Sequence, residues 1–496
     1  MLKLRVVTTA SKAKAVQAVR YKNNRRIVVK HFGSCQTDEQ LEQMLSFAKE
    51  WIKDVTGQLS FFPEENPNAI LYVDQCSFLG VRYSFFYDLI RRIQSQIGFD
   101  ASAEPLLMDM VTVRLFEPAS KLRSLELLEQ YFGIIHQRKS YYKAAPQWLY
   151  HKEAIEAAAV EFARKTFGFN FDLLFYDVTT LYFETFEEDE LRKNGFSKDN
   201  KSQQPQILVA LMVTKQGFPI AYEVFSGNTF EGHTIIPVVK DFINKHNVKD
   251  FTVVADAAMI SAENVEMLLE NDINYIVGAR LGNLPDKLIE QINKTIVRKE
   301  GNSIRIKTNN GYLICSYSAA RFRKDKYEME KQIEKAQAAI KEPAKIKKLK
   351  FTKSNNNTVE LNEALIEKTK KLLGIKGYYT NLEEETTSNK TIMERYHELY
   401  RVEQAFRISK SDLQTRPVFH YKEDPIKLHI LICFMALIVS KHVEIATGDS
   451  IKRFTAECKK VTVARILNHL TGKEINMQAK PTVKITQYLT KLNLPH

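Results

Sequence analysis

The stretch "FDLLFYDVTTLYFE", residues 171–184, decides the fold, because it places Asp177 at the centre of an apolar run rich in β-branched and aromatic residues. Such a run is typical of a buried strand. A buried carboxylate costs free energy unless a cation or a hydrogen-bond donor meets it. Asp177 therefore predicts a partner that reaches this strand from elsewhere in the chain.

The sequence after Asp177 alternates between strand and helix patterns. The tripeptide "KQG", between the second and third strands, is typical of a hairpin turn. Three strands followed by alternating helices and strands indicate an α/β fold with a mixed sheet flanked by helices. The expected strands are 171–183, 206–214, 218–225, 251–256 and 275–280, and the expected helices are 234–246 and 261–270.

Changes in the sequence pattern divide the whole chain into six parts. The regular spacing of apolar residues is lost after the α/β region, in a β-rich, charged segment, and it returns at 391–413 in a long amphipathic helix. The expected boundaries are 1–60 for a β-hairpin and helix, 61–168 for a mainly helical region, 169–280 for the first part of the core, 281–390 for an insertion, 391–445 for the end of the core and 446–496 for a helical tail.

Composition points to a soluble protein with an anionic partner. Hydrophobic residues make up 44% of the chain and charged residues 26%, as in ordinary globular proteins, but the formal net charge is +13. This charge favours nucleic acid over a membrane as partner, because no basic amphipathic anchor stands out. The alternative is a soluble protein that is merely basic.

Two segments concentrate the positive charge. "QRKSYYKAAPQWLY", with Arg138 and Lys139, follows a predicted helix at 118–132, and the pair resembles a helix-turn-helix reader of DNA. An ordinary helical bundle with a basic surface explains it equally well. The lysine-rich stretch "KEPAKIKKLKFTK" holds Lys347 and Lys348 within the expected insertion, where a solvated loop is the alternative.

Cysteine usage and the apolar runs indicate an intracellular location. The five cysteines include no CxxC pair, which favours a reducing cytosol over a disulfide framework or a zinc ribbon. The first residues lack the apolar core of a signal peptide. The longest apolar run, 428–439, is too short to span a bilayer and predicts a buried core helix.

Two further carboxylates are candidates to join Asp177. Asp256 ends the predicted strand "FTVVAD", and ligands of α/β sheets bind at the carboxyl ends of strands. At 100° per residue, Glu403 lies on the predicted helix at the border between an apolar stripe and a polar one that holds Tyr396, Arg407 and Lys410. The alternatives are local hydrogen bonds for the aspartates and a plain i,i+4 ion pair between Glu403 and Arg407.

Three carboxylates without histidine or cysteine are hard oxygen ligands, which suit Mg²⁺ or Mn²⁺. Two such ions about 3.5–4 Å apart can clamp the attacking and leaving oxygens of a phosphoryl transfer. Arg407 and Lys410 would hold a phosphodiester backbone beside them. The combination favours an enzyme acting on nucleic acid over a glycosidase, which needs only two carboxylates.

Three blocks, "YDVTTLYFE", "VVADAAMIS" and "YRVEQAFRISKSDLQTRPVFH", resemble the catalytic blocks of DDE-type bacterial insertion-sequence transposases. The resemblance covers about 170–440, and "RLFEPASK" at 114–121 is more loosely similar. It implies a ribonuclease-H-like core interrupted by an insertion. It also implies Asp177, Asp256 and Glu403 as catalytic and metal-binding residues.

What the resemblance implies for function is metal-dependent cleavage at the ends of an insertion sequence and strand transfer into target DNA. The implied cofactor is Mg²⁺, with Mn²⁺ able to substitute. The implied partners are double-stranded DNA, as terminal inverted repeats and target, and a second copy of the chain on that DNA, at the nucleoid in a bacterial cytoplasm. The expected DNA contacts are Tyr396, Arg407, Lys410, Arg138, Lys139, Lys347 and Lys348.

The family's helix motif has Tyr, two residues, Arg, three residues, Glu, six residues and Lys. Tyr396, Glu403 and Lys410 match it, but Leu399 stands at the arginine position. Arg407 or Arg395 is expected to supply the missing phosphate contact. Two other functions stay open: a metal-dependent nuclease that cuts without joining, and a catalytically inactive DNA-binding repressor.

Overall fold

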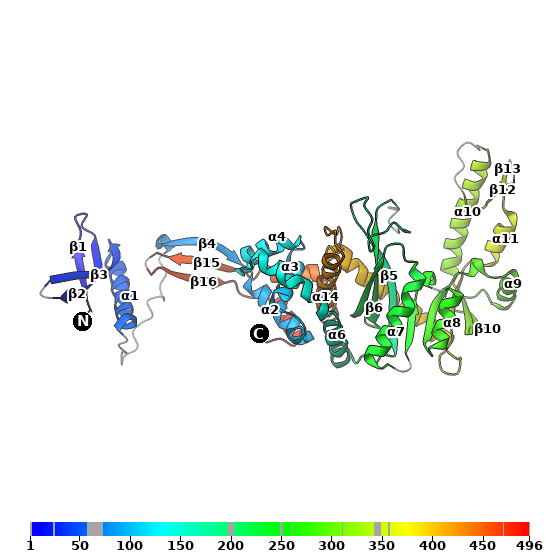
Figure 1. Ribbon diagram of the computed structural model, residues 1–496, viewed down its shortest axis with the longest axis horizontal. Helices are drawn as coiled ribbons and strands as arrows, with labels where there is room; N and C mark the ends of the chain where they lie inside the picture. Colours follow the sequence, from blue (N-terminus) through cyan, green and yellow to red (C-terminus); the bar gives the residue numbers. More distant parts are fainter. Residues whose placement is uncertain are drawn as a thin grey trace. The chain divides into compact units, whose positions relative to one another are not determined.

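The computed structural model forms two compact units (Figure 1). One unit comprises Met1–Asp88, Glu129–Ile134 and Ala456–Gln487, and the other comprises Leu89–Leu128, Ile135–Thr455 and Tyr488–His496. The residues described are 2–22, 25–56, 73–196, 203–248, 251–259, 261–309, 311–341, 349–355, 358–469 and 471–495.

The first unit contains two small antiparallel sheets. One is β1 (Leu2–Thr8), β2 (Lys14–Lys22) and β3 (Arg25–Cys35), with helix α1 (Asp38–Thr56) packed on it. The other is β16 (Lys473–Gln478), β15 (Val463–Asn468) and β4 (Cys76–Arg82). Strand β4 thus lies in a region expected to be mainly helical, and β15 and β16 lie in the expected helical tail. Local periodicity could not reveal them, because β4 pairs with a strand almost 400 residues away in sequence.

An eight-stranded mixed sheet forms the centre of the second unit, as the sequence predicted. Its order is β10-β11-β14-β9-β8-β5-β6-β7, in which β5, β8 and β9 run parallel and the other neighbours are antiparallel. The strands are β5 (Leu173–Tyr182), β6 (Gln206–Thr214), β7 (Pro219–Ser226), β8 (Thr252–Ala255), β9 (Asn274–Ala279), β10 (Ser303–Thr308), β11 (Gly311–Tyr317) and β14 (Ile375–Thr380).

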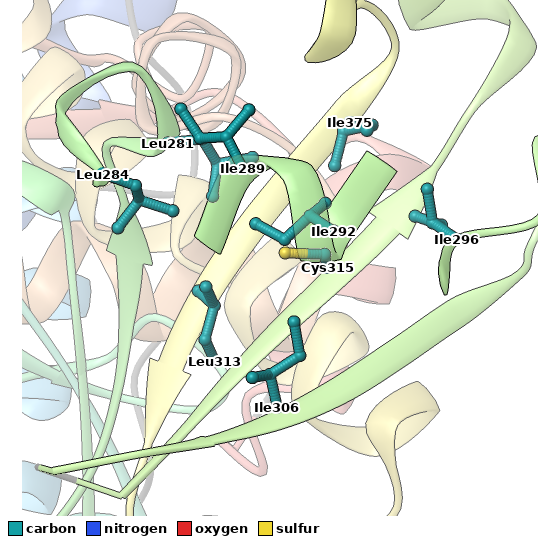
Figure 2. Packing of buried hydrophobic residues seen from close by; sticks show 9 residues of the cluster. All are labelled: Leu281, Leu284, Ile289, Ile292, Ile296, Ile306, Leu313, Cys315 and Ile375. Atoms are coloured by element: carbon teal, nitrogen blue, oxygen red, sulfur yellow. The ribbon is translucent and has the colours of Figure 1, made fainter. Parts of the chain in front are cut away.

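Residues 281–390 are continuous with this sheet, because they supply β10, β11 and β14. Helix α9 (Asp286–Thr295) covers these strands with Ile289 and Ile292, which are 1% and 0% exposed. Both side chains belong to one buried cluster with Leu313 and Cys315 of β11, which is shown in Figure 2. The segment also holds helices α10 (Ala319–Lys341) and α11 (Glu363–Lys371) and the short hairpin β12 (Thr352–Asn355) and β13 (Thr358–Leu361).

Helices surround the sheet and fill the core of the second unit. Helix α14 (Glu423–Thr447) is long and apolar enough to cross a membrane, but 83% of its most apolar window is buried in the protein, as expected for a core helix. It packs against α3 (Pro105–Phe116) and strand β7. The bounds are α2 (Ser84–Ile97), α3 (Pro105–Phe116), α4 (Lys121–Leu127), α5 (Arg138–Trp148), α6 (Lys152–Phe167), α7 (Ile235–His246), α8 (Ala262–Glu270), α12 (Asn389–His397), α13 (Tyr400–Arg407), α14 (Glu423–Thr447), α15 (Ile451–Cys458) and α16 (Val483–Lys491).

Candidate active site

The pairing of β5 with β8 brings two of the candidate carboxylates together. In this parallel pair Tyr176 lies opposite Ala255. Asp177 directly follows Tyr176 in β5, and Asp256 directly follows Ala255, the last residue of β8, so the two aspartates come immediately after paired residues of neighbouring strands. Beyond this rung β5 continues only alongside β6, where Asp177 faces Leu211. The sheet therefore opens at the two aspartates.

Alternation along β5 sets the face on which Asp177 lies. The hydroxyl of Tyr176 is turned toward α7 and donates a hydrogen bond of 2.7 Å to Thr234 Oγ1. Asp177 and Thr179 must then lie on the opposite face. Thr179 accordingly lines a cavity together with Phe406 of α13 and Phe434 of α14. The apolar residues Val402 and Phe406 are 0% and 8% exposed, which confirms the predicted packing stripe of the helix.

The helix that carries Glu403 is not the single helix expected at 391–413. It breaks after His397, and the junction is held by i to i+3 hydrogen bonds from Leu399 to Tyr396 and from Val402 to Leu399, each 3.1 Å long. Such tight turns rotate the chain more per residue than an α-helix does. A wider π-helical turn, Ile408–Asp412, follows α13 and contains Lys410. A projection at a constant 100° cannot reproduce either irregularity.

One cleft of about 510 Å³ gathers the predicted catalytic residues. All three carboxylates and the cations Arg407 and Lys410 line it, so five residues far apart in sequence meet in one place. Arg416, which the sequence did not single out, adds a third cation to the lining. The complete lining is Asp177, Val178, Thr179, Asp256, Leu399, Glu403, Phe406, Arg407, Lys410, Ser411 and Arg416.

Tyr396 contacts the second aspartate directly. Its hydroxyl donates a hydrogen bond of 3.1 Å to Asp256 Oδ1, which also accepts 2.7 Å from the Ala257 amide. The Tyr396 side chain is buried, and this burial together with the carboxylate of Asp256 raises the pKa of its phenol. Gly278 of β9 makes room for the contact, since a Cβ there would lie 2.5 Å from the Tyr396 hydroxyl.

Lys376 on β14 adds a positive charge beside Tyr396 that the sequence did not predict. Its Nζ lies 4.6 Å from the centre of the Tyr396 ring. Burial and the guanidinium of Arg321 lower the pKa of Lys376, while the carboxylates of Asp256 and Glu403 act in the opposite direction. The strand sequence "IKGYYT" does not indicate that Lys376 lies near Tyr396. This position results from the antiparallel pairing of β14 with β9, which no local sequence pattern shows.

The motif "RLFEPASK" fixes the segment that follows Lys410. Arg114 donates to the carbonyl of Leu413 at 3.4 Å, and Lys121 Nζ lies 2.9 Å from His429 Nδ1. The other ring nitrogen of His429 lies 2.8 Å from the carbonyl of Thr415. Both backbone carbonyls follow the π-helical turn, so this buried cluster holds the end of the segment that carries Glu403 and Lys410.

Other predicted residues lie elsewhere. Arg138 and Lys139 are exposed at the start of α5 and do not line the cleft. Lys347 and Lys348 fall outside the described residues. Of the two arginines expected to replace the missing one, Arg407 lines the cleft and Arg395 does not.

Leu399, which stands where the family has an arginine, and Glu403 both line the cleft. Leu399 is buried in the wall of the cleft with 5% exposure. Among the described residues, Glu403 forms no ion pair with Arg407 within 4.0 Å, so the simple i,i+4 pair is not formed. The side chain of Glu403 is exposed to the cleft instead.

The chemistry of the donor set fits a hard divalent cation. Within the described ranges, no group of three or more His, Cys, Asp or Glu side chains is arranged as a preformed metal-binding site. Mg²⁺ does not require one, because it usually takes one or two carboxylates and keeps several waters. Asp177 and Asp256, each directly after the last paired residues of β5 and β8, supply such a pair, and Glu403 lines the same cleft.

Residues 171–439 match the protein family described as "Transposase DDE domain", which is more than half of the chain. The chain belongs to this family. It is a DDE transposase-family protein, and its enzyme class is that of nucleases acting in transposition. Members generally use a divalent metal ion, in keeping with the carboxylates of the cleft.

Comparison with other proteins adds a distant likeness for this DDE transposase chain. One similar solved structure is a piggyBac transposase, described as "Cryo-EM structure of piggyBac transposase synaptic complex with hairpin DNA (SNHP)". The two are 12% identical with a TM-score of 0.38, over 85% of this chain and 77% of that chain. No curated protein matches the chain.

Proposed function

We propose that this transposase cuts DNA at the ends of its insertion sequence and joins the freed ends to target DNA, with Asp177, Asp256 and Glu403 holding Mg²⁺ or Mn²⁺. The observation that supports this most is the register of β5 and β8, which sets Asp177 beside Asp256 at the edge of a cleft that Glu403 also lines. Neither a repressor nor a plain DNA-binding protein needs three acids in a basic cleft.

The reaction consists of two displacements at phosphorus. Water attacks the phosphorus at the element end, the bond from phosphorus to the 3′ oxygen breaks, and a 3′-hydroxyl is released. That hydroxyl then attacks a target phosphodiester. A bond forms between the element's 3′ oxygen and the target phosphorus, the bond from that phosphorus to the target strand's own 3′ oxygen breaks, and the target strand leaves with a 3′-hydroxyl. Divalent ions bound at the carboxylates would supply the charge that stabilises the attacking and leaving oxygens.

The chain's own residues position the DNA and the carboxylates. Arg407, Lys410 and Arg416 line the cleft and bind the phosphodiester backbone on either side of the reacting phosphorus. Tyr396 was expected to contact DNA, but its buried hydroxyl is placed to hold the Asp256 carboxylate in one orientation. Holding reactants in place is what the protein adds to reactions of this type.

The active assembly is a homodimer on DNA, because two ends of one element must be held together before they are joined. We place it on the terminal inverted repeats and the target, at the nucleoid of a bacterial cell. Arg138 and Lys139, exposed on α5, are candidates for contacts with DNA away from the cleft.

Isosteric replacement of the acids tests this function. The variants Asp177→Asn, Asp256→Asn and Glu403→Gln are each incubated with Mg²⁺ and with DNA from both sides of the coding region. Each should bind this DNA as the wild type does and make no cuts at the element ends. Glu394→Gln on α12 is the matched control, because Glu394 is exposed and lies outside the cleft, and it should cut normally. Normal cutting by any of the three variants would disprove the assignment.

A further inference from the structure

The N-terminal module, formed by β1, β2, β3 and α1, carries its basic residues mainly on the sheet and its acidic residues on the helix. Residues 1–37 include nine Lys or Arg and no Asp or Glu. Helix α1, which packs on this sheet, is acidic, with five acids and two lysines between Asp38 and Thr56. The basic residues of the sheet segment are Lys3, Arg5, Lys12, Lys14, Arg20, Lys22, Arg25, Arg26 and Lys30.

The core of this module fixes which side of the sheet is covered. Val16 and Ala18 of β2, both 0% exposed, pack with Met44 and Ala48 of α1. Two of the basic side chains also turn toward the helix. Lys14 forms an ion pair of 2.6 Å with Asp38, and Lys30 Nζ lies 4.9 Å from the Trp51 ring, so neither is directed at a partner on the open side.

The other side of the sheet carries basic and polar side chains beside the valines Val19 and Val28. The strand register places Arg5 opposite Gln17, and Gln17 opposite His31. Gln17 lies between the core residues Val16 and Ala18, so its row faces away from α1, because directly opposed residues share a face. Figure 1 shows α1 alongside one side of the three strands.

One end of the sheet continues as a two-stranded ribbon. Strand β1 begins with Leu2 opposite Arg20. Beyond it, among the described residues, β2 and β3 continue with two rungs of their own, Tyr21 with Arg26 and Lys22 with Arg25. All four of these side chains are exposed. The ribbon is therefore a projection of arginine, lysine and tyrosine with no acid on it.

We propose that this ribbon and the open face of the sheet bind double-stranded DNA, with the ribbon in the major groove. A two-stranded β-ribbon fits that groove, arginine side chains can reach guanine edges there, and the surrounding lysines meet phosphates. The acidic helix α1 is unsuited to enter the groove. The inference goes beyond the cutting reaction, since it concerns a binding surface in the other unit of the chain.

The test measures binding by the full-length chain in EDTA, where no metal-dependent cutting occurs. The variants are Lys3→Glu on β1 and Arg26→Glu on the ribbon, and the matched control is Lys49→Glu, the same charge reversal at an exposed site on α1. The probes are duplex DNA from the flanks of the coding region and single-stranded RNA of the same length. Fluorescence anisotropy is recorded from 50 to 200 mM salt, values chosen because phosphate contacts are strongly screened over that range.

Each sheet variant should bind the duplex roughly tenfold more weakly at low salt and lose about one unit of salt slope, as expected for a lost phosphate contact. Lys49→Glu should bind as the wild type does. Arg26→Gln, which keeps a polar side chain, serves as a second variant if a reversed charge lowers the melting temperature. Equal effects of Lys49→Glu and Arg26→Glu, unchanged binding by both sheet variants, or tighter binding of RNA than of the duplex would overturn the proposal. Because no cutting is measured, its failure would leave the carboxylate assignment standing.

Discussion

Gly278 should be essential to the site because of the space it leaves for the Tyr396 hydroxyl. In Gly278→Ala the new Cβ would lie 2.5 Å from that oxygen, against about 3.4 Å for an ordinary contact. The hydroxyl must therefore retreat by about 0.9 Å, and its 3.1 Å hydrogen bond to Asp256 is lost. A hydrogen bond to a charged group contributes about 1.5–3 kcal/mol. If that energy holds Asp256 in its productive orientation, cutting slows roughly ten- to hundredfold.

A double-mutant cycle tests this reasoning. Single-turnover cutting of end DNA is measured for Gly278→Ala, Tyr396→Phe and the double variant. Tyr396→Phe removes the offending oxygen. The atoms then nearest to the new Cβ are the Ala257 Cβ at 3.1 Å and the ring Cζ at 3.2 Å, contacts that are relieved by shifts of a few tenths of an ångström. The double variant should therefore be no slower than Tyr396→Phe alone, since both changes act on one interaction. Losses that multiply, or full activity of Gly278→Ala, would refute the role given to the glycine.

Two other perturbations have definite outcomes. Lys410→Ala should weaken binding of end DNA and reduce the salt slope of that binding by about one unit, because Lys410 lines the cleft. The control Lys390→Ala, at an exposed site on α12, should leave both binding and slope unchanged. Equal salt slopes for the two variants would show that Lys410 makes no phosphate contact. Burial lowers the pKa of Lys121 from 10.5 to about 7, so the folded chain binds fewer protons than the unfolded chain between these values. The melting temperature should therefore rise with pH across that range, and Lys121→Met should flatten the rise; an unchanged pH profile would contradict this.

The sequence singled out Asp177 and Asp256 as candidates because each stands out locally, whereas Glu403 was chosen from its place on a predicted helix and from the family resemblance. Asp177 interrupts an apolar strand and Asp256 ends another, and strand patterns of this kind survive in the folded protein. The mixed sheet was also predictable, since its strands from 171 to 280 are separated by clear turns and helices. These features depend on neighbours within a few residues, which is the range that periodicity describes.

Features that depend on distant pairing were not predictable. Lys376 reaches the site only because β14 returns antiparallel beside β9, about 100 residues later in the chain. Gly278 matters only because the hydroxyl of Tyr396, from a helix far along the chain, packs against it. A glycine inside the apolar strand "NYIVGA" was the one signal available, because such glycines often mark a close approach of another group. The break after His397 was hidden for a different reason: buried side chains recur four residues apart on both sides of it, Ile392 and Tyr396 before it and Val402 and Phe406 after it.

The most direct test of the central claim is a strand-transfer assay with pre-cut ends. Duplexes that carry the element end with a free 3′-hydroxyl are mixed with target plasmid, Mg²⁺ and either the wild type or Asp256→Asn. The account predicts joined products with the wild type and none with Asp256→Asn, while both proteins bind the ends equally. Joined products from Asp256→Asn, or a wild type that cuts ends but never joins them, would contradict it.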